Sequence, residues 1–184
     1  MFAGSLSAVT GPGIFARRSA ALALLLLAVL GAAPRASADA TTDERTAEIK
    51  LLKIINRARD AKGLKLLKEH DVIRAEAEGQ SQRMADQGGL NHNGLQQREN
   101  RIAKADSGID PDQICENVAS AKSSNVQKSM KKIFVAWRAS QPHEDCMLDG
   151  LGYEERSAGV GVVFQDGVFW VTFIAASDTT PGSS

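Results

Sequence analysis

Residues 142–146 read PHEDC, which places one imidazole, two carboxylates and one thiol in five consecutive positions. Such groups exchange protons near neutral pH or bind metal ions. Because proline interrupts helices, we expect Pro142 to end the helix that contains Trp137 and to leave His143 in a short turn. Glu144 and Asp145 are then expected to be solvated acids of that turn. The remaining groups of any chemical site must come from elsewhere in the chain.

Two other segments carry polar groups of the same kinds. Residues 91–94 read NHNG in an expected loop, and residues 115–119 read CENVA at the start of an expected short strand. A single loop histidine is more often solvated or at a helix end than a ligand. The third histidine, His70, has no evident partner and is expected at the surface. Each segment taken alone is therefore weak evidence for a site.

The first 38 residues have the pattern of a secretory signal peptide. Arg17 and Arg18 precede an apolar run over residues 20–33, and residues 36–38 read ASA, a small-residue cleavage site. The run is short for a bilayer, which needs roughly 20 apolar residues, so an uncleaved anchor is the less favoured alternative. We expect a secreted, extracellular or cell-envelope protein with no integral membrane segment after cleavage.

Removal of this leader leaves 146 residues, the usual size of one domain. The whole chain has 22 basic and 22 acidic side chains, and the leader holds three arginines and no acid, so the remainder carries a formal charge of −3. This mild acidity argues against nucleic acid as a partner. We expect the folded domain at residues 47–176, with flexible segments at 39–46 and 177–184.

The chain has two cysteines, Cys115 and Cys146. In an oxidising compartment a lone pair of this kind more often forms a disulfide than remains as two thiols. Metal ligation by the pair is the alternative, but no C-x-x-C spacing supports it. We therefore favour a disulfide that joins the PHEDC stretch to the segment around Glu116.

Apolar residues at helical spacing predict four helices in the first two thirds of the domain. They are expected over residues 46–61, 71–87, 95–105 and 126–139. Gly63 is expected to close the first helix, Asp71 to cap the second, and a loop over residues 107–111 to follow the third. The stripe that includes Met130 and Trp137 is expected in the core.

The last third of the chain predicts a β-hairpin. Residues 158–164 and 168–174 are rich in valine and aromatic residues, and Asp166-Gly167 between them favours a tight turn. Both runs are mostly continuous rather than alternating, which is typical of strands covered on both faces. The expected fold class is therefore α/β, a three-layer α–β–α sandwich with a central sheet.

Several short motifs occur in a characteristic order along the chain. They are Ile55-Asn56 with Arg59, Gly63-Leu64, Met84, His92, ENVA at 116–119, Trp137, Ser140, Pro142-His143 and GVGV at 159–162. This ordered set resembles the CAP superfamily of cysteine-rich secretory, antigen 5 and pathogenesis-related proteins. The resemblance is greatest to the bacterial secreted SCP-like domains. It covers about residues 47–175, and its most specific parts are ENVA and W-x-x-S-x-P-H.

The resemblance implies a sandwich with a mainly antiparallel sheet and a large open cleft. His92, Glu116 and His143 match the residues that converge at the cleft floor in that family, and Asn117 and Ser140 stand beside them. Eukaryotic relatives add a second glutamate after the tryptophan, which this chain lacks, as bacterial relatives commonly do. Glu144 is the candidate to replace it.

Two departures from the family pattern fit each other. Cys115 replaces the usual glycine before Glu116, and Cys146 stands where many bacterial relatives have asparagine. If Glu116 and His143 share one floor, the two neighbouring cysteines come within the roughly 4.4–6.8 Å between Cα atoms that a disulfide needs. The resemblance therefore supports a Cys115–Cys146 disulfide.

Three functions remain open. His92, His143 and Glu116 can hold Zn²⁺ with water in the fourth position, which would make a metal-dependent hydrolase. No H-E-x-x-H pair supports that alternative, and no G-x-S-x-G turn presents Ser140 as a nucleophile. We favour a binding module, with no required cofactor, whose cleft takes a small amphipathic ligand: a lipid, a peptide or a cell-wall fragment. A secreted structural or interaction domain with a vestigial cleft is the third possibility.

Overall fold

A computed structural model describes residues 42–148 and 155–178 of the chain. The expected signal peptide at 1–38 lies outside these residues. The elements are α1 (Thr42–Ala61), β1 (Lys68–Glu69), α2 (Asp71–Gln87), α3 (Leu95–Ala105), β2 (Ile109–Lys122), α4 (Val126–Arg138), α5 (Gln141–Leu148), β3 (Glu155–Gln165) and β4 (Val168–Asp178). Within the described ranges, no helix has the length and apolar character needed to cross a membrane.

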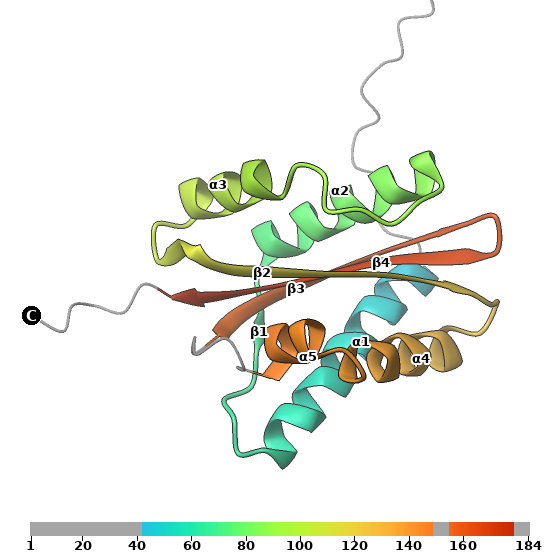
Figure 1. The fold of residues 1–184 in the computed structure, drawn as a ribbon, viewed down its shortest axis with the longest axis horizontal. Helices are drawn as coiled ribbons and strands as arrows, with labels where there is room; N and C mark the ends of the chain where they lie inside the picture. The colour runs from blue at the N-terminus through green and yellow to red at the C-terminus, as the bar shows by residue number, and fades with distance from the viewer. Residues whose placement is uncertain (1–41, 149–154, 179–184) are drawn as a thin grey trace, which may run out of the picture. The chain divides into compact units, whose positions relative to one another are not determined.

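The domain has three layers, as the sequence predicted. A four-stranded sheet in the order β1-β3-β4-β2 forms the middle layer. The pairs β2–β4 and β3–β4 are antiparallel, and only the short β1 runs parallel to β3. Helices α2 and α3 cover one face of the sheet, whereas α1, α4 and α5 cover the other (Figure 1). The α–β–α sandwich with a mainly antiparallel sheet is therefore confirmed.

The predicted hairpin of β3 and β4 forms the centre of the sheet. Its turn places Asp166 at φ 52° and Gly167 at φ 77°. Positive φ at both central residues is the conformation that two-residue hairpin turns require, and Asp-Gly adopts it at low cost. The local turn chemistry therefore fixes the register of β3 against β4.

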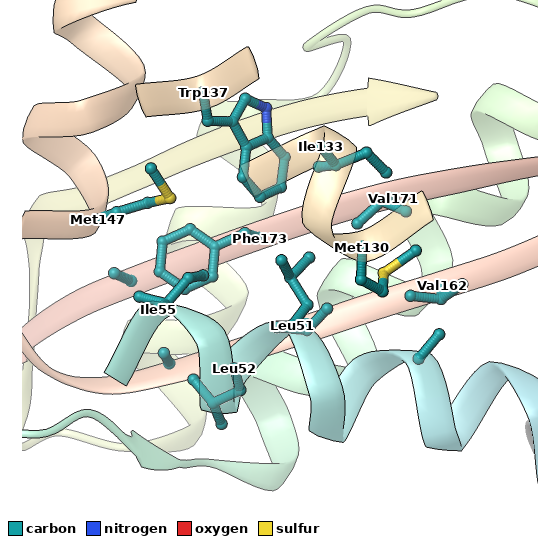
Figure 2. Packing of buried hydrophobic residues seen from close by; sticks show 14 of the residues in the cluster. Leu51, Leu52, Ile55, Met130, Ile133, Trp137, Met147, Val162, Val171 and Phe173 are labelled. Atoms are coloured by element: carbon teal, nitrogen blue, oxygen red, sulfur yellow. The ribbon is translucent and has the colours of Figure 1, made fainter. Parts of the chain in front are cut away.

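The larger core lies between the sheet and the layer of α1, α4 and α5 (Figure 2). Leu51 and Ile55 of α1 pack with Met130 and Ile133 of α4 over the apolar residues of β3 and β4. Trp137 is 2% exposed, and its Nε1 donates a hydrogen bond to the main-chain oxygen of a β2 residue at 3.2 Å. Trp137 is thus a core residue, as predicted.

On the opposite face, α2 approaches β3 so closely that only glycine fits between them. A Cβ atom at Gly161 would overlap the backbone of Ala77 and Glu78. One turn along α2, the Ser81 hydroxyl donates a hydrogen bond to the Gly161 carbonyl at 2.8 Å. The GVGV motif therefore sets the distance between α2 and the sheet.

Several predicted boundaries were wrong. Residues 42–46 belong to α1 and residues 177–178 belong to β4, so these elements extend beyond the predicted domain bounds. The N-cap of α2 is His70, not Asp71. His70 also has a partner, because its Nε2 lies 3.0 Å from the Asp106 carboxylate. The expected loop at 107–111 is shorter than predicted, since β2 begins at Ile109. The pairing of β2 with β4 is irregular between Ile109 and Ile114, and a proline is compatible with such an irregular stretch of a strand.

The expectation that Pro142 leaves His143 in a short turn was also wrong. Helix α4 ends at Arg138, and a new helix, α5, begins at Gln141. Pro142 is the second residue of α5, where the backbone N–H groups have no acceptor within the helix and proline costs little. His143, Glu144, Asp145 and Cys146 are therefore helical.

Candidate functional site

The carboxylate of Glu116 lies on β2 and points toward the α3 side of the sheet. Arg98 of α3 binds both of its oxygens, with Nε to Oε2 at 2.8 Å and Nη2 to Oε1 at 2.7 Å. The Glu116 side chain is fully buried and that of Arg98 is 1% exposed. A two-point guanidinium–carboxylate contact is the strongest form of this ion pair, and both charges are withdrawn from water.

The other donors of Arg98 are also engaged. Its Nη1 donates to the Gln80 side-chain oxygen at 2.9 Å and to the Asn93 main-chain oxygen at 2.8 Å. Gln80 is fully buried, and its amide nitrogen donates to the Asn91 carbonyl at 2.7 Å. Arg98 thereby connects α2, α3, β2 and the NHNG loop, and every member of this buried network has a partner.

His92 is the exposed member of the cluster. Its Nδ1 lies 2.8 Å from Glu116 Oε1, while 47% of its side chain remains exposed. Arg98 already donates two hydrogen bonds to the Glu116 carboxylate, which acts there as an acceptor, so the hydrogen of the His92–Glu116 contact is assigned to His92 Nδ1. The other ring nitrogen, Nε2, is then the acceptor that neutral His92 can offer to a ligand.

The neighbours of Glu116 on β2 point to the opposite face of the sheet, as the alternation of a strand requires. Asn117 donates its side-chain amide to the His143 main-chain oxygen at 2.9 Å. Cys115 forms a disulfide with Cys146 across 5.7 Å between Cα atoms, so the predicted disulfide is confirmed. Both contacts connect β2 to α5.

The side chains of the W-x-x-S-x-P-H motif form a helix start. His143 Nδ1 lies 2.8 Å from the Ser140 hydroxyl, and the Ser140 carbonyl accepts the first hydrogen bond of α5, from the Glu144 amide. Glu144 itself pairs with Arg138 at 2.8 Å and with Lys62 at 3.4 Å. Its carboxylate is therefore bound to these cations rather than to the His92–Glu116 pair.

The comparisons with known proteins agree with this architecture. The model of the cysteine-rich secretory protein family, CAP, matches residues 52–170. This chain belongs to the CAP family. Among solved structures, an outer surface protein of Borrelia burgdorferi is similar to this CAP domain with a TM-score of 0.59 and 17% identity, over 77% of this chain and 97% of that chain.

Two bacterial structures are similar over part of their own length. A cysteine-rich secretory protein of Staphylococcus aureus gives a TM-score of 0.56 at 18% identity, over 74% of this chain and 40% of that chain. An extracellular SCP-domain protein of Bacillus anthracis gives 0.53 at 20% identity, over 71% and 41%. A search of curated proteins found no match. At these identities the likeness shows the fold alone.

The arrangement in this CAP domain does not fit a metal ion held by His92, Glu116 and His143. Among the described residues, no three or more His, Cys, Asp or Glu side chains form a group that could hold one. Both oxygens of Glu116 are bound by Arg98, and the Nδ1 atoms of the two histidines are bound to different partners, Glu116 and Ser140. The structure brings His92 to Glu116 and His143 to Ser140 as two pairs.

Arg98 is the site residue that sequence reasoning missed. The segment 95–105 contains three basic residues and one acidic residue, so its charged side chains are expected to face solvent. One signal was present: Arg98 stands four residues before Ile102, the apolar residue that α3 buries. A charged residue on the buried stripe of a helix indicates a buried partner.

A second feature was not predicted: a surface groove of about 460 Å³ along α1 and the start of α4. Its lining combines aliphatic and basic side chains and includes no acid; the residues are Thr46, Ile49, Lys50, Lys53, Ile54, Arg57 and Gln127. Half of the Ile49 surface is exposed, so its aliphatic side chain is accessible in the groove. Lys50 Nζ donates to the Gln127 side chain at 3.1 Å and connects the two walls.

Proposed function

We propose that this CAP domain is a secreted binding module for a small amphipathic ligand with an anionic head. The observation that carries the proposal is the α1–α4 groove. Ile49 and Ile54 offer aliphatic surface, and Lys50, Lys53 and Arg57 offer positive charge along the same wall. A ligand with a hydrocarbon part and a carboxylate or phosphate matches both features at once.

The size and charge of the groove support this assignment. A volume of about 460 Å³ is within the range of small-molecule sites, which are roughly 300–1,000 Å³. Within the described ranges, neither Lys53 nor Arg57 is paired with an acidic side chain, so both cations are available to a ligand head. Helix α4 adds Lys128, Lys131 and Lys132 and has no acid of its own. The field over this face therefore attracts anions.

The leader pattern supports secretion, and the solved relatives described as outer surface or extracellular proteins are consistent with it. A hydrolase is less well supported. The Ser140–His143 pair starts helix α5, and its serine stands on no strained turn that would present a nucleophile. Binding therefore accounts for the observed features with fewer assumptions than catalysis does.

Two measurements test the proposal. Organic extraction of protein secreted by its host, followed by mass spectrometry, should release a stoichiometric anionic lipid or other amphiphile. Titration with a fluorescent fatty acid should then show saturable binding that the double variant Lys53→Glu/Arg57→Glu weakens by about tenfold or more, equivalent to about 1.4 kcal/mol.

The matched control is Lys131→Glu, which changes charge on the same face outside the groove lining. It should leave the affinity nearly unchanged. If no ligand is extracted and both charge variants bind the probe as the parent does, the groove is not a binding site. The structural or interaction domain would then be the better account.

A further inference from the structure

We propose that Arg98 takes the place of a metal ion at the His92–Glu116 pair, so that this CAP domain presents His92 to ligands without zinc. The site differs from the α1–α4 groove, and either proposal can fail alone. Two features support this: Arg98 and His92 bind both oxygens of Glu116, and His92 keeps an exposed ring.

The hydrogen bonds of Glu116 leave no accessible oxygen for a metal. Oε2 accepts from Arg98 Nε, and Oε1 accepts from both Arg98 Nη2 and His92 Nδ1, all within 2.8 Å. The carboxylate is fully buried, so a metal ion would have to displace one of these donors. Displacing Arg98 would leave a guanidinium buried without its counter-ion, which is strongly unfavourable.

Charges of both signs lie around the cluster, with Arg83 and Arg101 on the positive side and Glu76 and Glu99 on the negative side. Gln80 Oε1 accepts from both Arg98 and Arg83, at 2.9 and 3.0 Å, which brings a second guanidinium to the cluster. Burial, together with nearby Arg98 and Arg101, lowers the pKa of Arg83. The charge around Glu116 is thus mixed, and the obstacle to a metal ion is the occupation of both carboxylate oxygens by Arg98.

Arg98 nevertheless supplies what a metal would supply: a fixed positive charge that binds and orients the Glu116 carboxylate. Glu116 in turn holds His92 through Nδ1, and 47% of the His92 side chain stays exposed, so Nε2 is the ring nitrogen left for a ligand. A carboxylate that fixes the tautomer of a histidine is a familiar positioning arrangement. The ligand group expected at Nε2 is a hydrogen-bond donor, such as a sugar hydroxyl or an amide N–H.

Nitrogen NMR on the unmodified domain tests the proposal directly. The chain has three histidines, so a sample labelled with ¹⁵N at histidine gives three ring patterns, which the variants His92→Gln and His143→Gln assign. We expect the His92 ring, in its neutral form, to carry its hydrogen on Nδ1, and its ring signals to stay unchanged when one equivalent of Zn²⁺ is added to metal-free protein.

Two results would overturn the proposal. One is a His92 ring with its hydrogen on Nε2. The other is a saturable one-to-one shift of the His92 and His143 signals together on addition of Zn²⁺. Because both readouts use the parent sequence and report on His92 itself, neither depends on a variant that fails to fold. Zinc binding at another surface group would leave the His92 signals unchanged and would not be mistaken for this site.

Discussion

Replacing Arg98 by alanine should destabilise the domain far more than replacing Arg101 on the same helix. Each arginine binds a glutamate through Nε and Nη2, Arg98 with Glu116 on β2 and Arg101 with Glu76 on α2. The two pairs differ in burial: the Arg98 side chain is 1% exposed and that of Arg101 is 49% exposed. Helix, residue type and contact geometry are otherwise matched.

The expected magnitudes follow from that difference. Removing one partner of a buried ion pair costs about 3–5 kcal/mol, because the remaining charge has no counter-ion. Arg98→Ala also removes a donor from Gln80 and from the Asn93 carbonyl, whereas the gain in helix propensity is only a few tenths of a kcal/mol. Arg101→Ala breaks an exposed pair worth about 0–1 kcal/mol. We therefore expect a difference of about 3 kcal/mol or more.

Urea unfolding with the disulfide intact measures both free energies. The slope of the transition should remain that of the parent, so that the midpoint reports stability. In a Glu116→Gln background, Arg98→Ala should cost less than it does alone, since no buried anion is left behind. If Arg98→Ala proves no more costly than Arg101→Ala, the Arg98–Glu116 pair is not the buried centre described above.

Three further predictions address the fold. Reducing the Cys115–Cys146 disulfide, which closes a separation of 31 residues, should lower the free energy of unfolding by roughly 3–4 kcal/mol, as measured in urea with and without reductant. Gly161→Ala should destabilise by about 1–3 kcal/mol or more because its Cβ overlaps α2 backbone, whereas Gly79→Ala within α2 should be neutral or stabilising; thermal melting of both variants checks this. Burial raises the pKa of Glu48 from 4.5 to about 7, so ionisation opposes folding. The free energy of unfolding should therefore fall by roughly 1–3 kcal/mol as the pH rises from 4.5 to about 7. The urea midpoint of the Glu48→Gln variant should not show this decline.

Most of the fold could be predicted because its signals are local. The bounds of α3 follow from one amphipathic stripe, and the hairpin follows from Asp166-Gly167 between two valine-rich runs. Predicting the Cys115–Cys146 disulfide needed two non-local inputs, the expectation of an oxidising compartment and the resemblance to CAP proteins. Each of these predictions rests on a sequence pattern that is compatible with few alternative structures.

The errors arose where one residue is compatible with two structures. Pro142 can follow a helix or occupy the first turn of the next one, and only the packing of α5 against β2 and α1 decides between them. Arg98 looks like any charge on a polar helix, because its partner Glu116 lies 18 residues further along and on a different element. Local sequence patterns carry no information about such a pairing.

The alternation of β2 explains why the site forms two pairs. Since successive side chains of a strand point to opposite faces, Glu116 faces α3, while Cys115 and Asn117 face α5. His92 therefore meets the carboxylate on one side of the sheet, and the contacts of His143 with β2 run through its backbone on the other. Opening the disulfide should consequently loosen α5 and His143 while the His92–Glu116–Arg98 cluster keeps its geometry, because the remaining contacts of that cluster run to α2 and to the NHNG loop rather than to α5.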